Sequence, residues 1–417
     1  MSISERPRVR IWVHSAIPIT PERAHGCRCL FDFPLKHHQS KPSMSLPSET
    51  LSRIIHPPTL HQPVLSACQI RTTVNDFQVE EIPAYQPTGA GEHAYLWIEK
   101  RGVASPELVN RIIKTLGVPS KDVGLAGQKD RYAVTRQFCS IPKRLAINTE
   151  KLNSDDVKVL SVTPHNNKLK TGHLKGNRFQ ITLRNPESPY TAADVEKVQT
   201  RLNELVASGI PNYFGPQRFG HGGNTVVDGL RLLKGKLPKD HWPESRSRTL
   251  RRLALSSVQS AVFNLVASSR VTAGTASTPQ PGDVVIRKNG TKPYLYPEGA
   301  DTENIVPAGP MPGPEMPAAK GAVAETEAAA LMTMGLQPRD FERFAKLTSG
   351  VRRKMVEFPS EVSAILNDDS SMTLGFVLSA GTYATTLLQE IAAQVIDLGP
   401  DAAPVYSEPE DEPSTGE

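Results

Sequence analysis

The chain has 417 residues, of which 38% are hydrophobic and 22% are charged, with 29 glycines and 36 prolines. This length predicts two or three domains, and the composition is typical of a soluble globular protein rather than a collagenous or wholly disordered one. Because no stretch of about 18 consecutive apolar residues exists, the sequence excludes a membrane-spanning protein.

Residues 1 to about 50 lack apolar periodicity and a secretory signal, so we expect a poorly ordered N-terminal extension. Alternating apolar and polar residues predict strands at residues 68–74, 76–82, 94–100, 134–141, 179–184, 283–287 and 373–378. Helices are predicted at residues 105–116, 191–206, 250–271 and 383–395. The acidic, proline-rich residues 396–417 are predicted to be disordered. Together these elements predict an α+β fold.

Three of the predicted helices carry local signals. Ser105 is expected to cap the first helix, and Thr191 the second, which should stop near Gly209. The third helix is expected to bury one apolar stripe, whose members are Leu253, Val258, Val262, Phe263 and Val266.

Residues 1–400 are more basic than the net charge of +5 suggests, because residues 401–417 hold six acids and no Lys or Arg. Without them, 48 cations face 37 acids, an excess of 11. The densest cationic segment, residues 231–252, has a net charge of +6 and includes Arg248, Arg251 and Arg252. Such a cluster can neutralise the phosphates of a nucleic acid, but it is equally compatible with a solvated helix face.

The four cysteines, Cys27, Cys29, Cys68 and Cys139, are too few and too scattered to staple the fold. Cys27 and Cys29 also lack the spacing of a zinc knuckle. We therefore predict a reducing compartment, the cytoplasm, and no structural metal.

The first segment that suggests chemistry is GLAGQKDRYAVTRQ, at residues 124–137. Its single carboxylate, Asp130, lies between Lys129 and Arg131, and neighbouring cations favour the ionised form that a nucleophile needs. Physics alone allows an exposed turn with a local ion pair just as well.

Two further segments have compositions that suggest a binding site. Residues 168–179, KLKTGHLKGNRF, combine cations and glycines with Asn177 and Phe179, which suits phosphate contact, base-edge recognition and base stacking. The alternative is a basic hairpin in which Phe179 begins a core-facing strand. Residues 209–224, GIPNYFGPQRFGHGGN, crowd aromatic rings, Arg218 and glycines together, and this favours a site. By contrast, the chain has no P-loop, strand-linked GxGxxG, HExxH or GxSxG motif.

In this order and spacing, the three segments resemble the TruD family of tRNA pseudouridine synthases, as do residues 350–353 and 378–385. The resemblance covers about residues 68–395. It implies a pseudouridine synthase catalytic domain with an inserted TruD-specific α+β domain, U-shaped with a basic cleft. The implied division is an extension at 1–50, catalytic parts at 51–213 and 350–395, the insertion at 214–349, and an acidic tail at 396–417.

The resemblance also implies the site residues. Asp130 is the expected nucleophile, Lys129 and Asn177 hold its charge and orientation, and Phe179 contacts the target base, where other pseudouridine synthases usually have Tyr. Tyr132 stands where family members often have His. Further substrate contacts are expected from Arg131, Lys175, Phe214, Arg218 and Phe219, and RNA backbone contacts from Arg248, Arg251 and Arg252.

The implied reaction isomerises uridine to pseudouridine, at position 13 of tRNA, on a base flipped out of its stack. It needs no metal, nucleotide or other cofactor, and the expected protein is a monomer that uses tRNA but no membrane. Two alternatives stay open: a non-catalytic RNA-binding or RNA-folding protein with the same cleft, and a base-modifying enzyme that uses a methyl donor.

Overall fold

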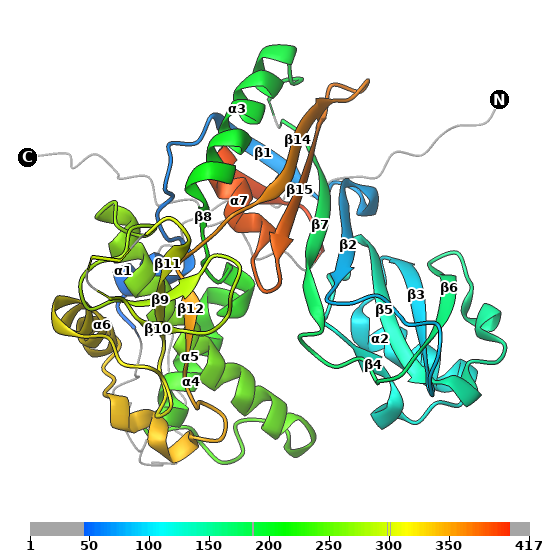
Figure 1. The fold of residues 1–417 in the computed structure, drawn as a ribbon, viewed down its shortest axis with the longest axis horizontal. Helices are drawn as coiled ribbons and strands as arrows, with labels where there is room; N and C mark the ends of the chain where they lie inside the picture. The colour runs from blue at the N-terminus through cyan, green and yellow to red at the C-terminus, as the bar shows by residue number, and fades with distance from the viewer. Residues whose placement is uncertain (1–45, 186, 298, 301, 401–417) are drawn as a thin grey trace, which may run out of the picture. The chain divides into compact units, whose positions relative to one another are not determined.

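The computed structural model describes residues 46–400, apart from residues 186, 298 and 301 (Figure 1). Most of the predicted extension and most of the predicted acidic tail therefore lie outside the described residues, as do Cys27 and Cys29. The described residues belong to one compact unit, so the division at residues 213 and 349 stays a prediction. No helix in residues 46–400, as far as they are described, has the length and apolarity needed to cross a bilayer.

Seven α-helices occur in the described part of the chain. They are α1 (Ser48–Ile55), α2 (Ser105–Leu116), α3 (Ala192–Ser208), α4 (Asn224–Leu233), α5 (Glu244–Thr272), α6 (Gly321–Thr333) and α7 (Ala384–Ile391).

The largest sheet has eight strands in the order β14, β15, β7, β2, β5, β3 and β6, with the short β4 also paired to β5. Its strands are β2 (Phe77–Pro83), β3 (His93–Arg101), β4 (Gly124–Leu125), β5 (Val134–Pro142), β6 (Val157–His165), β7 (Leu174–Leu183), β14 (Ser360–Leu366) and β15 (Met372–Ser379). All pairs are antiparallel except β2 with β5.

Three smaller sheets complete the fold. A four-stranded sheet has the order β10 (Tyr294–Leu295), β9 (Val284–Arg287), β11 (Ile305–Met311) and β12 (Val351–Lys354). Two strand pairs join distant parts of the chain: β8 (Ile210–Pro211) with β13 (Val356–Glu357), and β1 (Leu65–Ile70) with β16 (Ala392–Asp397). The second pair is parallel and brings residues 65–70 beside residues 392–397, which lie far apart in the sequence.

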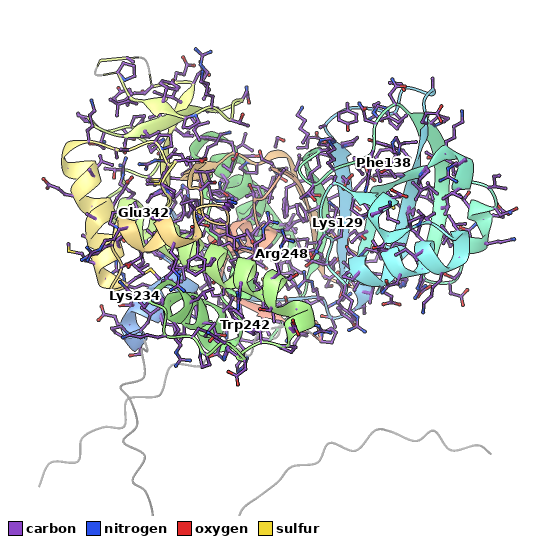
Figure 2. All side chains as sticks on the ribbon, turned by 90° about the horizontal axis from the view of Figure 1, so that it is seen from below. Lys129, Phe138, Lys234, Trp242, Arg248 and Glu342 are labelled. Carbon is purple, nitrogen blue, oxygen red and sulfur yellow. The ribbon has the colours of Figure 1, made fainter. Side chains whose placement is uncertain are left out.

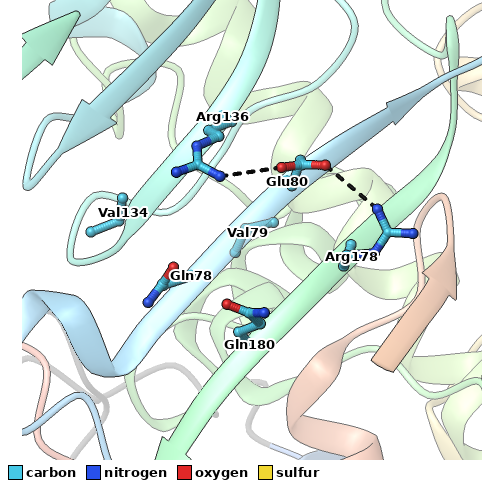
Figure 3. A pocket seen from close by; sticks show the side chains of 7 residues that line it. All are labelled: Gln78, Val79, Glu80, Val134, Arg136, Arg178 and Gln180. Atoms are coloured by element: carbon cyan, nitrogen blue, oxygen red, sulfur yellow. Dashed lines mark hydrogen bonds and ion pairs between the residues drawn. The ribbon is translucent and has the colours of Figure 1, made fainter. Parts of the chain in front are cut away.

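The two faces of the eight-stranded sheet differ in character at β2 and β7. Phe77, Val79 and Phe179 are buried on one face, because side chains alternate along a strand. On the other face, Arg136 pairs with Glu80 at 3.4 Å, and Arg178 pairs with Glu80 at 3.5 Å (Figure 3). These residues are direct cross-strand neighbours, so the ion pairs follow from the register. They line a shallow hollow on the open face of the sheet.

The buried side chains form separate apolar clusters. One cluster is built mainly by α4, α5, α6 and β11. A second lies between α3, α7 and strands β2, β7 and β15, and a third between α2 and strands β3 and β5. The second cluster matters for function, because its sheet side also forms the wall of a pocket described below.

The helix signals in the sequence are confirmed in part. Thr191 caps α3 and forms a capping box with Asp194, as its position predicts. Ser105, however, does not cap α2: Ala104 is the N-cap, and the Ser105 hydroxyl accepts a hydrogen bond from the Lys129 backbone N–H at 2.9 Å. The cap prediction was wrong because a partner distant in sequence competes for the hydroxyl.

Helix α5 is longer than predicted and is not a one-stripe helix. Val258, Val262, Phe263 and Val266 are buried as expected, but Leu253 is 40% exposed. From residue 254 onward the helix is buried on nearly all sides, so the apolar residues do not mark a single face.

Two element boundaries differ from the sequence prediction where β1 and β16 meet. The helix predicted at 383–395 ends at Ile391, and the next residues form β16 against β1. The strand predicted at 68–74 ends at Ile70, because Arg71 takes a left-handed backbone with a φ of 58°. The pairing of β16 with β1 sets the first boundary, and the left-handed backbone of Arg71 sets the second. Local periodicity reports neither.

Candidate active site

A pocket of about 380 Å³ lies where the face of β2 and β7 meets the loop between β4 and β5 and the start of α7. We call it the Asp130 pocket. Its lining residues are Arg71, Phe77, Val79, Gln128, Lys129, Asp130, Asn177, Phe179, Gln217, Gly381, Thr382, Tyr383, Ala384 and Thr385. Four residues predicted to act at the site, Lys129, Asp130, Asn177 and Phe179, thus line one cavity although they come from two separate segments.

The carboxylate of Asp130 is accessible, with 48% of its side chain exposed. One Oδ atom lies 3.4 Å from Nη2 of Arg71, whose own side chain is only 9% exposed. The other arm of the guanidinium donates to Asp397 at 2.6 Å, and its centre lies 4.1 Å from the ring of Phe77. Arg71 is therefore held by Asp397 and Phe77 and presents one cationic edge to Asp130.

Sequence reasoning missed Arg71. It stands in an ordinary strand-like segment, far from the Asp130 motif, and no spacing links the two. The expected cationic partner, Lys129, points elsewhere: its Nζ lies 3.1 Å from Glu81 Oε2, and both side chains are buried. Burial raises the pKa of Glu81, while Lys129 and the Phe138 N–H act in the opposite direction.

The backbone of the Asp130 loop is also held in place. Lys100 is buried and donates to the carbonyl oxygens of Val103 and Asp130, at 2.7 and 2.8 Å. Its burial lowers the pKa of Lys100 to about 8. With the Ser105 hydrogen bonds to Lys129, these contacts fix the main chain on both sides of the carboxylate. The side chain of Asp130 is therefore accessible, while the backbone that carries it is held by hydrogen bonds.

Asn177 and Phe179 stand two residues apart on β7, so both face the pocket. The Oδ1 atom of Asn177 is buried and has no hydrogen-bond partner among the described residues. An unpaired buried acceptor is costly, so this oxygen is suited to a donor brought by a ligand.

Phe179 serves both the core and the pocket. Its ring is 6% exposed, stacks on Phe376 with a centroid distance of 5.2 Å, and meets Phe77 edge-on at 6.2 Å. Phe179 therefore faces the core as the alternative predicted, although β7 begins at Leu174 rather than at Phe179. The same ring forms part of the pocket wall.

The substrate contacts expected from residues 209–224 do not line the Asp130 pocket. Phe219 is fully buried in the α4–α5 cluster and cannot touch a substrate, so that prediction was wrong. Phe214 is nearly buried beneath Arg353, and Arg218 donates to Ser260 at 3.2 Å. From residues 209–224, it is Gln217 that lines the pocket. The aromatic rings of this segment fill the core, because large rings stabilise most when buried.

Arg131 and Lys175 are exposed and do not line the Asp130 pocket. Arg248, Arg251 and Arg252 are exposed on the first turns of α5, and no ion pair to the described residues ties them down. Figure 2 marks Arg248 on this helix. All five cations are free to meet a polyanion, so their RNA contacts stay predictions.

No group of three or more His, Cys, Asp or Glu side chains is placed to hold a metal ion in the part of the chain that the structure describes. Cys68 and Cys139 are buried free thiols, and burial raises the pKa of each to about 12. They are therefore unreactive core residues rather than ligands or nucleophiles.

The family described as tRNA pseudouridine synthase D (TruD) matches residues 65–241 and 244–391. The chain belongs to the TruD family. Relatives named tRNA pseudouridine synthase D, from an Anaeromyxobacter species and from Thermus thermophilus, are 35% and 37% identical. Each alignment covers 78% of this chain, and 93% and 88% of the respective relative.

A solved structure supports the fold. The putative tRNA pseudouridine synthase D from Methanosarcina mazei superposes with a TM-score of 0.64 at 23% identity, covering 84% of this chain and 98% of the other. The α+β TruD fold expected from the sequence is thereby confirmed. The family match spans all three motif segments that form or flank the Asp130 pocket.

Proposed function

We propose that this TruD protein is a tRNA pseudouridine synthase that isomerises uridine 13, with Asp130 as the nucleophile. One observation carries the proposal: the accessible carboxylate of Asp130 shares a pocket with the unpaired Asn177 oxygen and the Phe179 ring. Family membership supports the reaction class, and the names of the relatives support tRNA as the substrate.

In the proposed reaction, the bond between ribose C1′ and uracil N1 breaks, and C1′ joins C5 instead. The proton lost from C5 is balanced by a proton gained at N1, so the product is an isomer of the substrate. Asp130 attacks either C1′ or the uracil C6 carbon, and leaves again when the new bond has formed. No electron or group is transferred to another molecule, so the reaction as written requires no cofactor.

The pocket residues have distinct parts in this scheme. Arg71 compensates the charge of the Asp130 carboxylate and holds its direction. Asn177 Oδ1 accepts a hydrogen bond from the uracil N3–H or a ribose hydroxyl, which orients the nucleotide. Phe179 forms a flat apolar wall for the ring. The uridine reaches the pocket only after leaving its stack, at a cost of about a few kcal/mol that is lowest in loops.

The test is to incubate the protein with unmodified tRNA transcript, without any cofactor, and to map pseudouridine at each position. We expect product at position 13, and a rate lower by a factor on the order of 10⁴ or more for Asp130→Asn. Asp155→Asn is the matched control, because Asp155 is exposed and lies outside the pocket. Undiminished product with Asp130→Asn would refute the assigned nucleophile.

The same assay separates the enzyme from a non-catalytic RNA-binding or RNA-folding protein. That alternative predicts no pseudouridine with the wild type, and tRNA binding that Asp130→Asn leaves intact. Product at another position would retain the enzyme but replace the assigned target.

A further inference from the structure

A second pocket, of about 330 Å³, lies beside the first. We call it the Gln389 pocket. It is formed by the end of α1, the end of β1, the loop after β8, helix α7 and strand β16, and its lining residues are Ile55, His56, Ile70, Pro216, Gln217, Gly220, Gly222, Thr385, Gln389, Ala393, Gln394, Val395 and Asp397. Its volume lies in the range of roughly 300–1,000 Å³ that is common for small-molecule sites.

Two side chains belong to both pockets, Gln217 and Thr385. The partition between the cavities is therefore made of these two residues. Arg71 forms a second link, because one arm of its guanidinium donates to Asp397 of the Gln389 pocket and the other lies beside Asp130. A ligand that extends from one cavity into the other would pass this partition without crossing the core.

The chemistry of the Gln389 pocket suits a nucleobase. Ile55, Ile70 and Val395 give it apolar walls. The amides of Gln389 and Gln394 make no hydrogen bond within the described residues, so both are free to donate and accept. Apolar surfaces for the ring faces, with free amides for the ring edge, are what an unstacked base requires.

The loop side of the pocket allows close approach of a ligand. Gly220 and Gly222 take left-handed backbone conformations with φ of 76° and 56°, and neither places a side chain in the cavity. The one carboxylate in the lining, Asp397, is already paired with Arg71. The lining contains no Lys or Arg that could bind a phosphate, which favours the base over the backbone as the occupant.

We propose that the Gln389 pocket binds the base of the nucleotide next to the target uridine in the same RNA strand. The proposal rests on the function proposed above, in which a uridine is extruded into the Asp130 pocket. Extruding one nucleotide unstacks its neighbour, and a neighbouring cavity that receives this second base compensates part of the lost stacking. Gln217 and Thr385 lie between the two bases.

The experiment fills the pocket without touching the core. Ala393 lies in the lining and is exposed, so Ala393→Phe places a ring in the cavity. Ala193→Phe makes the same change on the exposed first turn of α3, outside both pockets, and serves as the control. Gln394→Leu removes one exposed amide at nearly constant size and provides a second variant.

Binding is read with tRNA transcripts that carry 2-aminopurine at position 12 or at position 14. Wild type and Ala193→Phe should raise the fluorescence of the probe at one of these positions, whereas Ala393→Phe should abolish the rise. Gln394→Leu should reduce the affinity for that transcript about 3- to 10-fold, the effect expected for one lost hydrogen bond. Equal fluorescence changes for wild type and Ala393→Phe at both positions would overturn the proposal.

Pseudouridine is measured in parallel on unlabelled transcript. If the wild type forms no pseudouridine but shows the probe response that Ala393→Phe abolishes, the proposed reaction fails and the base-binding pocket stands. If the wild type forms pseudouridine but Ala393→Phe matches it in rate and probe response, the reaction stands and the pocket assignment fails.

Discussion

The guanidinium of Arg71 lies 3.4 Å from the carboxylate of Asp130, and its other arm is held by Asp397 at 2.6 Å. Arg71 reaches this position because its backbone turns left-handed where β1 ends. Asp397 reaches it because β16 pairs with β1, which places Asp397 opposite Ile70. The direction of the candidate nucleophile thus depends on the pairing of β1 with β16, two strands that lie far apart in the sequence.

Replacing Arg71 should therefore impair chemistry more than binding. We expect Arg71→Gln to lower the single-turnover rate at saturating tRNA on the order of 10²-fold, because the carboxylate loses its nearest positive charge. Arg71→Lys keeps the charge but cannot bridge Asp130 and Asp397 at once, so it should recover only part of the rate. A full rate for Arg71→Gln would show that Asp130 does not depend on this contact.

The buried ion pair between Glu81 and Lys129 predicts a loss of stability. Glu81→Gln leaves the Lys129 ammonium buried without its partner, which typically destabilises a protein by about 3–5 kcal/mol. Glu80→Gln on the same strand is the matched control. Glu80 contacts Arg136 and Arg178 on the open face of the sheet, where exposed pairs contribute about 0–1 kcal/mol. Urea unfolding measures both free energies.

A compensated variant extends this comparison. Glu81→Met combined with Lys129→Met removes both charges, so it should be more stable than Glu81→Gln alone. Equal free energies of unfolding for Glu81→Gln and Glu80→Gln would contradict the assigned burial of the pair.

The sequence predicted the site better than it predicted the contacts that support the site. Asp130, Asn177 and Phe179 lie in short motifs whose order is typical of a known family, so their meeting in one pocket was predictable. Arg71 and Asp397 carry no such signal, since their contact exists only after β1 and β16 pair. Long-range pairing of this kind leaves no mark on local periodicity.

For the aromatic residues, the sequence predicted a site residue that the structure places in the core. Phe219 stands in a segment crowded with Gly, Arg and aromatic residues, which favours a site, yet its ring is fully buried. Composition cannot distinguish a ring that meets a ligand from a ring that fills a core, because both need a large apolar surface. Gln217, two residues earlier, lines both pockets although its side chain is unremarkable in the sequence.

Lys100 predicts a pH-dependent contribution to stability. Burial lowers the pKa of Lys100 from its ordinary 10.5 to about 8, so the folded protein holds this proton less tightly than the unfolded chain does. The free energy of unfolding should therefore rise between about pH 8 and 10.5 by an amount on the order of 3 kcal/mol. Lys100→Met should lack this rise.

The measurement is urea unfolding of wild type and Lys100→Met from about pH 7 to 10.5, compared as a difference at each pH. Lys114→Met is the control, because Lys114 is exposed near the end of α2. The difference for Lys114→Met should stay constant with pH. A constant difference for Lys100→Met as well would mean that the Lys100 ammonium stays charged over the whole range.

The exposed cations on the first turns of α5 should make tRNA binding depend on salt concentration. Arg248, Arg251 and Arg252 are exposed, and phosphates bound by such side chains release condensed counterions. Each contact contributes about 0.7–0.9 to the slope of log affinity against log salt, so reversing all three charges to Glu should flatten the slope by about 2–3 and weaken binding.

Reversal of three other exposed cations, Lys143, Arg144 and Lys151, is the control for net charge. Filter binding of tRNA between about 50 and 300 mM salt measures both slopes. If the two triple variants change the slope equally, the α5 cations act only through net charge, and α5 does not contact the RNA backbone.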